Sequence, residues 1–319
     1  MWREAICDFQ FLFFDLKGKT TIRLEDGTCV MSGGSQIENL KSKTENASYD
    51  PDAFWNARLD KDFSLSGVGH TSVGLAFNRW AYKVRRRVLL RQLTAHNIPV
   101  RDTRILELAF GTGYYLDLWR ELGAAHVFGM DIAHVAVRAA CERFAAQNWR
   151  FEQGDIGKSL PSEAPAASFD LATAFDVLFH LVEDVSWNGA LDNLAAALKP
   201  GGYAVIFDKF QKQESAGSHV RRRTLAHYHE ALERRGFEIQ VLKPIFFVMN
   251  SPTDLEGISG VFWRLGWSLA KLPYKVGKPV GLGEAFGACA GAALYGPELL
   301  MGHLFSSGPS TKVLIAKRR

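Results

Sequence analysis

The stretch that most constrains the fold is 104–131, which reads as a strand, a tight turn, a helix and a second strand. Three of the four residues at 105–108 are leucine or isoleucine, the short apolar run that is typical of a buried parallel strand. Gly111 and Gly113 let the backbone of the following turn approach a ligand closely, and 114–122 continues with helical spacing. Together these elements predict a nucleotide-type βαβ unit inside an open parallel sheet.

Two acidic residues in this unit restrict the ligand that it can hold. Asp131 ends the second strand, and an acid at this place can accept hydrogen bonds from both hydroxyl groups of a ribose. Glu107 lies inside the first strand, where its charge would repel a pyrophosphate at the N-terminus of the helix. The third glycine of a dinucleotide fingerprint would fall at Leu116, so NAD is disfavoured. A cationic ligand that has a ribose and no phosphate is favoured instead.

The pattern Glu107-x-Ala109-x-Gly111-x-Gly113 resembles the acid-x-Gly-x-Gly-x-Gly motif of the class I S-adenosylmethionine-dependent methyltransferases. The first glycine of the motif is Ala109 here, and its extra methyl group is expected to be tolerated if the local φ is negative. The resemblance implies an α/β fold with a Rossmann-like, mostly parallel seven-stranded sheet whose last strand is antiparallel. It also implies S-adenosylmethionine (S-adenosyl-L-methionine) as the cofactor.

Later segments extend this resemblance to about residues 100–210, and more weakly to both ends. The Lys-Pro-Gly-Gly turn at 199–202, in front of an apolar strand, resembles a turn of the same family and should stop the preceding helix. The remaining elements are predicted as helix 133–147, strand 149–153, strand 169–175, helix 188–198, strand 203–207, helix 224–235, strand 237–241 and strand 311–317.

The chain before the first strand is predicted to form two parts. Residues 1–48 hold a short aromatic run and a polar stretch, and are expected to be either a loosely docked N-terminal arm or an extension before a natural start at Met31. No signal peptide is expected, because no small-residue cleavage site follows the apolar run. Residues 49–98 are expected to form a helical cover segment, and 99–319 the methyltransferase domain.

The cover segment begins with an aromatic stretch in which Tyr49, Trp55 and Arg58 resemble the residues that many methyltransferases place over the cofactor. Ordinary helix packing is the alternative. A second helix, at 75–93, has one apolar and one basic face. The basic face is expected to be solvated, and attraction of an anionic acceptor, carrier protein or lipid surface is the alternative.

A long insertion at about 245–309 separates the last two predicted strands. It is rich in large apolar side chains, so we expect it to roof the acceptor pocket, to select the substrate and to be removable from a folded domain. A simple extension of the core and a reversible membrane contact are the alternatives. Thirteen residues separate Glu284 from Glu298, fewer than a transmembrane helix needs.

The chemistry expected from the resemblance is an in-line methyl transfer, for which the protein aligns two reactants and, with a hydroxyl acceptor, removes a proton. Because ligands bind beyond the carboxyl ends of parallel strands, His180 is the preferred base and Asp208 its assistant or an acceptor contact. Packing beside the pocket is the alternative role for His180. The residues expected to contact the cofactor are Tyr49, Trp55, Arg58, Glu107, Ala109, Gly111, Gly113, Asp131, Ile132, Asp155, Ile156 and Phe175.

Composition limits the alternatives. A hydrophobic content of 47% and a net charge of +4 describe a globular chain without a strong pull toward nucleic acid. Four cysteines without metal-ligand spacing favour a reduced, cytoplasmic protein without a metal site. Peripheral membrane contact and the oligomeric state stay open.

The function that we predict from the sequence is O-methylation of a small molecule, such as a secondary metabolite, a glycan or a lipid-like acceptor. RNA or protein methylation is the alternative, although the chain has no separate RNA-binding module and no Asn/Asp-Pro-Pro-aromatic signature after the fourth strand. A non-catalytic pseudo-methyltransferase that binds a cofactor or partner is the alternative from another class.

Overall fold

The computed structural model describes residues 23–25, 28–30, 49–253 and 257–319. The chain divides into two units, Met1–Ser48 and Tyr49–Arg319. In the first unit, the described residues form a two-stranded antiparallel hairpin of β1 (Arg23–Glu25) and β2 (Thr28–Val30). The rest of the predicted arm, including the start at Met31, lies outside the described residues.

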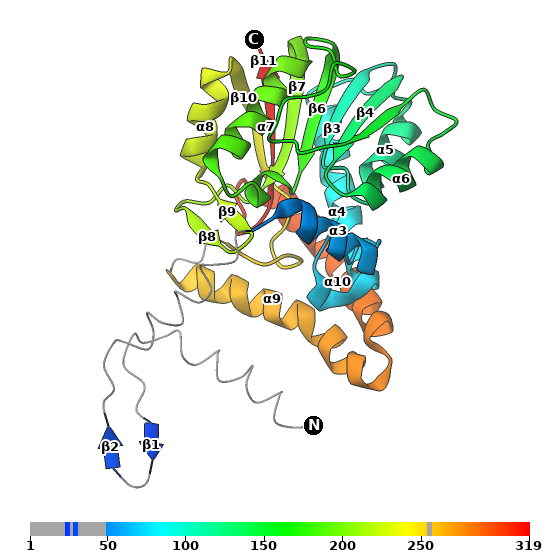
Figure 1. Cartoon of the computed structure of the whole chain (residues 1–319). Helices are drawn as coiled ribbons and strands as arrows, with labels where there is room; N and C mark the ends of the chain where they lie inside the picture. The colour runs from blue at the N-terminus through cyan, green and yellow to red at the C-terminus, as the bar shows by residue number, and fades with distance from the viewer. Residues whose placement is uncertain (1–22, 26–27, 31–48, 254–256) are drawn as a thin grey trace. The chain divides into compact units, whose positions relative to one another are not determined.

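The second unit is built on a seven-stranded sheet with helices on both faces (Figure 1). The strands lie in the order β10-β11-β7-β6-β3-β4-β5, and β11 is antiparallel to both of its neighbours while the other pairs are parallel. The predicted Rossmann-like sheet is therefore confirmed. The bounds are β3 (Arg104–Leu108), β4 (His126–Asp131), β5 (Arg150–Gln153), β6 (Phe169–Phe175), β7 (Leu198–Asp208), β10 (Phe237–Pro244) and β11 (Lys312–Arg318).

Each face of the sheet is covered by its own helices, because alternate side chains of a strand point to opposite faces. Ile105 and Val205 are fully buried on the face of α4 (Gly74–Ala95), α5 (Tyr114–Leu122) and α6 (His134–Arg143). Their neighbours Leu106 and Ile206 are fully buried on the face of α7 (Asp184–Ala197) and α8 (Leu225–Arg234). The near-continuous apolar strands thus serve two cores at once.

The helix ends follow local sequence signals in several places. Gly123 ends α5 in the left-handed region, at φ 80°. The hydroxyl oxygen of Thr224 accepts a hydrogen bond from the backbone N–H of His227 at 3.1 Å, and so caps α8 as predicted. The helices predicted at 133–147 and 188–198 have other bounds, since α6 ends at Arg143 and α7 begins at Asp184.

The predicted turn at 199–202 lies inside strand β7 rather than before it. Leu198 pairs with Phe169 and Tyr203 pairs with Leu171, so the four residues between Leu198 and Tyr203 face a single residue of β6. Gly201 takes φ 83° in this bulge, which a side chain would disfavour.

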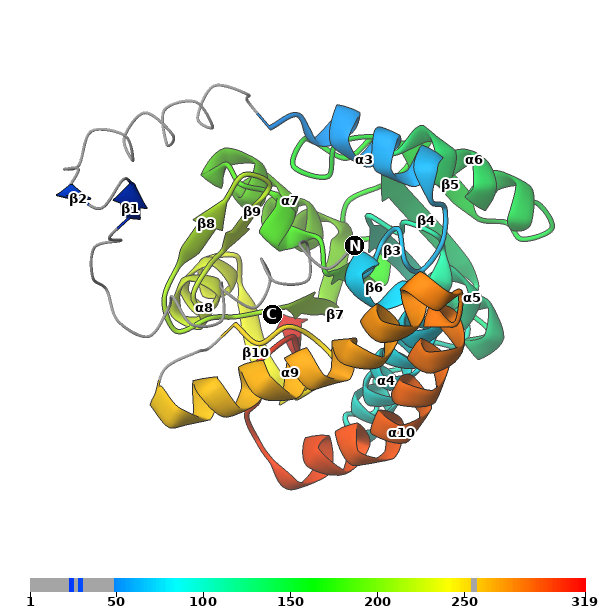
Figure 2. The same ribbon diagram turned by 90° about the horizontal axis from the view of Figure 1, so that it is seen from below.

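The cover and the insertion supply three more helices, α3 (Pro51–Lys61), α9 (Gly257–Gly277) and α10 (Gly283–Leu304). α10 lies along α4 in both views (Figures 1 and 2). A Cβ atom at Gly291 would lie 2.6 Å from the Trp80 ring, so the missing side chain permits this close approach.

Glu284 of α10 accepts hydrogen bonds from backbone N–H groups of another helix. The carboxylate of Glu284 accepts from the N–H groups of Leu75 at 3.1 Å and Ala76 at 2.6 Å, and so caps α4 from a distant part of the chain. Trp267 of α9 is buried in the same core as the sheet. Of the interpretations of the insertion, extension of the core fits this packing best.

Candidate functional site

A cleft opens at the carboxyl ends of β3, β4 and β6. Figure 2, which views the domain from this end, shows α3 and α9 on opposite sides of the strand ends. The cleft is lined by residues of the cover segment between Tyr49 and Arg85, by Glu107 of β3 and the turn after this strand, and by residues at the ends of β4, β5 and β6. None of the described residues of the insertion lines this cleft, so these residues do not form the expected roof over it.

The turn after β3 is fixed by Asp131 at the end of β4. The N–H of Gly111 donates to one carboxylate oxygen at 2.7 Å, and the N–H of Ala133 donates to the other at 2.9 Å. Burial raises the pKa of Asp131, whose side chain nevertheless lines the cleft. Ala109 takes φ 57°, so the condition under which its extra methyl group would be tolerated is not met, and the methyl group occupies a position that favours glycine.

Glu107 lines the cleft from inside β3 and is 1% exposed. The indole N–H of Trp119 donates to its carboxyl group. Burial raises the pKa of Glu107 to about 8, because the low-dielectric surroundings penalise the charged form. The carboxyl group is therefore a site where a neighbouring cation would be strongly favoured.

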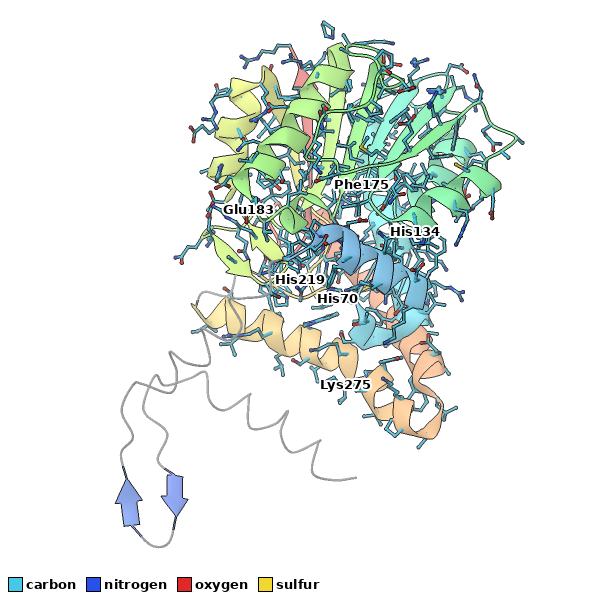
Figure 3. The ribbon with its side chains drawn as sticks, in the orientation of Figure 1. His70, His134, Phe175, Glu183, His219 and Lys275 are labelled. Carbon is cyan, nitrogen blue, oxygen red and sulfur yellow. The ribbon has the colours of Figure 1, made fainter. Side chains whose placement is uncertain are left out.

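Three of the apolar candidates and a third acid surround the rest of the cleft. Ile132, Ile156 and Phe175 all line it, and Figure 3 shows Phe175 at the end of the sheet that faces the cleft. Asp155 lines it too, and one of its oxygens accepts from the N–H of Gly157 at 2.8 Å. The structure thus brings the acids predicted after β4 and β5 to one cavity.

Arg85 and Asp176 form a buried ion pair in the wall of the cleft that we did not predict. Burial raises the pKa of Asp176, while the guanidinium of Arg85 opposes that shift. The sequence held a signal for Arg85: it follows Ala81 by four residues, on the apolar stripe of α4, where a charged residue needs a partner. Asp176 directly follows β6 and takes φ 56°.

His180 lines the cleft, and burial lowers its pKa to about 4. Its Nδ1 lies 3.0 Å from the backbone oxygen of His219, in the turn between β8 (Ser215–Gly217) and β9 (Val220–Arg222), a hairpin that we did not predict. A carbonyl oxygen can only accept, so Nδ1 carries the proton and Nε2 keeps its lone pair. The neutral ring can therefore accept a proton.

The aromatic cover reaches the cleft only in part. Tyr49 and Trp55 line it, and the Trp55 ring meets the His180 ring edge-on at 5.0 Å. Arg58 does not line it, because its guanidinium donates to the backbone oxygens of Gly67 at 2.5 Å and Gly69 at 3.2 Å. The predicted cofactor contact of Arg58 is therefore replaced by a bracing role under the cover.

Asp208 and Gly113 also lie outside the lining of the cleft. The hydroxyl of Tyr228 and the N–H of Lys209 both donate to Asp208, and burial raises its pKa to about 6. This arrangement supports the end of β7 and gives no direct contact with a ligand in the cleft. Gly113 begins α5 at φ 74°, where it shapes the turn rather than the wall.

A smaller cavity of about 260 Å³ adjoins the cleft and shares Tyr82 and Arg85 with it. It is lined in part by Phe246 and Asn250, at the start of the insertion. His70, whose place below the sheet is seen in Figure 3, holds the side-chain oxygen of Asn250 through Nε2 at 2.5 Å. Among the described residues of the insertion, Phe246, Met249 and Asn250 line this smaller cavity.

The charge of the cleft is the property that most restricts its ligand. Four carboxyl groups line it, those of Glu107, Asp131, Asp155 and Asp176, and the guanidinium of Arg85 is already paired. Within the part of the chain that the structure describes, no group of three or more His, Cys, Asp or Glu side chains could hold a metal. The helices among these residues also include none that is long and apolar enough to cross a membrane.

Comparison with known proteins finds a match to a known family in the central part of the chain. Residues 105–202 match the family described as a methyltransferase domain. The chain is 30% identical over 140 residues to a ribosomal protein L11 methyltransferase of Ralstonia nicotianae, across 44% of this chain and 42% of that protein. It is 24% identical over 94 residues to a malonyl-[acyl-carrier protein] O-methyltransferase of Hamiltonella defensa, across 28% and 36%.

The chain spans less than half the length of these curated relatives. Among solved structures, a putative sarcosine dimethylglycine methyltransferase from Galdieria sulphuraria aligns with a TM-score of 0.48 at 16% identity, over 73% of this chain and 83% of that one.

Proposed function

We propose that the chain is a class I S-adenosylmethionine-dependent methyltransferase whose cleft binds S-adenosylmethionine and supports methyl transfer to a small-molecule acceptor, in keeping with the methyltransferase-domain match at residues 105–202. The observation that carries the proposal is the acidic lining of the cleft, with one guanidinium that is already paired. Such a wall suits a ligand with an ammonium, a sulfonium and a ribose, and it opposes a phosphate.

Each part of the cofactor has a matching group in the proposal. Glu107 holds the ammonium group, Asp131 accepts from the ribose hydroxyls, and Asp155 accepts from the adenine amino group. The N–H groups of Gly111 and Ala133 each donate to one oxygen of Asp131 and hold the carboxylate in place for the ribose. Ile132, Ile156 and Phe175 supply apolar surface for the adenosine, and Tyr49 and Trp55 cover the methionine end.

The cofactor, when bound, supplies a methyl group on a positively charged sulfur. The chain then has to align the acceptor with the bond between the methyl group and the sulfur, and to exclude water. For a hydroxyl acceptor it also has to remove a proton. In the proposal, Nε2 of His180 takes that proton. The backbone oxygen of His219 fixes the tautomer, and the edge of Trp55 restricts the ring.

Oxygen of a small molecule is the acceptor that we propose, from a secondary metabolite, a glycan or a lipid-like compound. Trp55, which lines the cleft against the His180 ring, supports this choice, because its aromatic surface suits an apolar acceptor. A protein acceptor is the second candidate, since one relative is a ribosomal protein L11 methyltransferase. A cytoplasmic location stays a prediction.

The cofactor assignment is tested by titration calorimetry on the variant Asp131→Ala. We expect S-adenosylmethionine to bind this variant about 1–3 kcal/mol more weakly than the parent, because a buried charged hydrogen-bond partner is lost. Asp155→Ala is the matched variant at the adenine end. If both variants bind like the parent, or if the parent binds NAD instead, the assignment is wrong.

A screen of extracts with a labelled methyl donor identifies the acceptor. Label in small molecules supports the proposal, and label confined to a protein band supports the second candidate. A parent that binds S-adenosylmethionine and transfers no label to any fraction points to a pseudo-methyltransferase.

A further inference from the structure

Helix α9 carries a continuous apolar stripe that the domain leaves uncovered. Seven of its side chains are large, apolar and 50–90% exposed. Apart from the adjacent Val261 and Phe262, they recur at spacings of three and four residues, so all seven lie on one face of the helix. The stripe consists of Ile258, Val261, Phe262, Leu265, Leu269, Leu272 and Val276.

The opposite face of the same helix anchors it to the domain. Trp267 is 7% exposed and Ala270 is 6% exposed, and both belong to the core that underlies the sheet. α9 is therefore held in place by one face while the stripe points away. Figure 1 shows α9 at the end of the domain toward which the parallel strands run, opposite the end that holds the C-terminus.

The charged residues of α9 are all basic. Arg264, Lys271 and Lys275 follow one edge of it at spacings of seven and four residues, and Lys278 comes directly after the helix. Figure 3 shows Lys275 on this helix, away from the sheet. The sequence holds no Asp or Glu from 257 to 283. The neighbouring acids in the sequence are Asp254 and Glu256 before this stretch and Glu284 after it, and Glu284 is engaged in capping α4.

An apolar face with basic residues beside it fits an anionic bilayer surface better than a second copy of the chain. A helix of this kind lies in the interface plane, with the apolar side chains at the headgroup boundary and the cations near anionic headgroups. A symmetric pair of these helices would instead bring like charges together. Lysine is also depleted at the cores of protein interfaces.

We propose that α9 docks this protein on anionic lipid bilayers through its apolar stripe. The docking goes beyond the proposed methyl transfer and does not depend on it. It would bring the end of the domain that holds the cleft toward the lipid.

The test is co-sedimentation of the full chain with vesicles of phosphatidylcholine and phosphatidylglycerol in equal parts, and with vesicles of phosphatidylcholine alone. We expect binding to the anionic vesicles that falls about tenfold or more when salt is raised or phosphatidylglycerol is omitted. The double variant Leu265→Ser with Leu269→Ser should lose at least about tenfold in affinity, since both side chains are exposed and their loss leaves the core intact.

Val185→Ser is the matched control, because Val185 is a large apolar residue on α7 that is 85% exposed. It should bind the vesicles like the parent, and all variants should unfold at the same urea concentration. Arg264→Gln with Lys275→Gln should reduce the salt dependence. A parent that does not bind, or a serine variant that binds unchanged, overturns the proposal. So does a lipid-free dimer that the serine variant abolishes without any vesicle binding by the parent.

Discussion

Glu107 couples the proposed cofactor to pH. Burial raises its pKa to about 8, so at pH 7 the free protein holds this carboxyl mostly protonated. A bound cation favours the carboxylate, so we expect cofactor binding to release a proton and the affinity to rise between about pH 6 and 8, by up to about tenfold per unit. The rise ends near pH 8, where an α-amino group of the ligand loses its own charge.

Calorimetry in two buffers with different protonation enthalpies measures this proton release directly. Glu107→Gln keeps the shape of the side chain and cannot ionise, so its weaker binding should be nearly independent of pH over the same range. A parent with no proton release at pH 7 would place the cation elsewhere in the cleft.

His180 tests the chemistry rather than the binding. His180→Ala should leave S-adenosylmethionine binding near normal and lower turnover about 10²–10⁴-fold for a hydroxyl acceptor, the usual effect of a lost general base. Because burial lowers the pKa of His180 to about 4, the parent should show no loss of turnover from this group until the pH approaches 4.

The matched control is His219→Ala, which removes the stacked ring and keeps the backbone oxygen that holds Nδ1. Its turnover should fall by only a few-fold. Equal losses in both variants would show that His180 packs beside the pocket and does not act as the base.

At the scale of elements, Glu298 joins α10 to the segment after β10. It is fully buried, and its carboxyl group accepts from the N–H groups of Val248 at 3.2 Å and Met249 at 3.5 Å. Burial raises the pKa of Glu298 to about 7, so the folded state binds this proton more tightly than the unfolded state does. Its contribution to the free energy of unfolding is complete below about pH 4.5 and is lost as the pH rises through 7.

The variant Glu298→Gln keeps an oxygen acceptor and cannot ionise. Relative to the parent, it should therefore gain up to about 3 kcal/mol in unfolding free energy between about pH 5 and 8, measured by urea unfolding. Other buried carboxyl groups are present in both proteins, so the difference isolates Glu298. A constant difference across this range would contradict the raised pKa.

Elements with strong local signals could be predicted from the sequence, and elements made by distant contacts could not. The strand at 169–175 and the helix at 114–122 have the predicted bounds, because apolar runs and Gly123 set them locally. The cap that Glu284 gives to α4 joins residues about 200 apart in the chain, and no local pattern indicates it.

The same division holds in the site. The acids at the strand ends, Asp131 and Asp155, reach the cleft because strand topology places them there. Arg58 and Asp208 miss it, because neighbouring backbone and side-chain groups take their polar atoms. The pairing of Arg85 with Asp176 joins two elements, and its geometry depends on how α4 packs across the sheet.

At the scale of the whole molecule, the insertion and the cover form one body with the sheet. α10 packs along α4, and α4 in turn supplies Tyr82 and Arg85 to the cleft. The partly buried Leu294, Tyr295 and Leu299 of α10 pack on the main core. The insertion thus supports the cleft from behind α4, although its described residues do not line it.

This arrangement changes the outcome that we expect from removing the insertion. Replacing 252–308 with a short linker would uncover the buried face of α4, remove the cap supplied by Glu284 and take Trp267 out of the core. Each large side chain lost from the core costs about 1.5–3 kcal/mol, so the total is comparable with the about 5–15 kcal/mol that stabilises a typical domain. We therefore expect an insoluble or unfolded product, judged by soluble yield and by urea unfolding. A shortened chain that stays soluble, unfolds like the parent and binds S-adenosylmethionine would show instead that the insertion is a separable attachment, as the sequence alone had led us to expect.

Gly291→Leu tests the contact between α10 and α4 with a single side chain. The added side chain would collide with Trp80, so the free energy of unfolding should fall. Gly296→Leu is the control, because nothing lies within 4 Å of that position, and it should leave the free energy of unfolding unchanged.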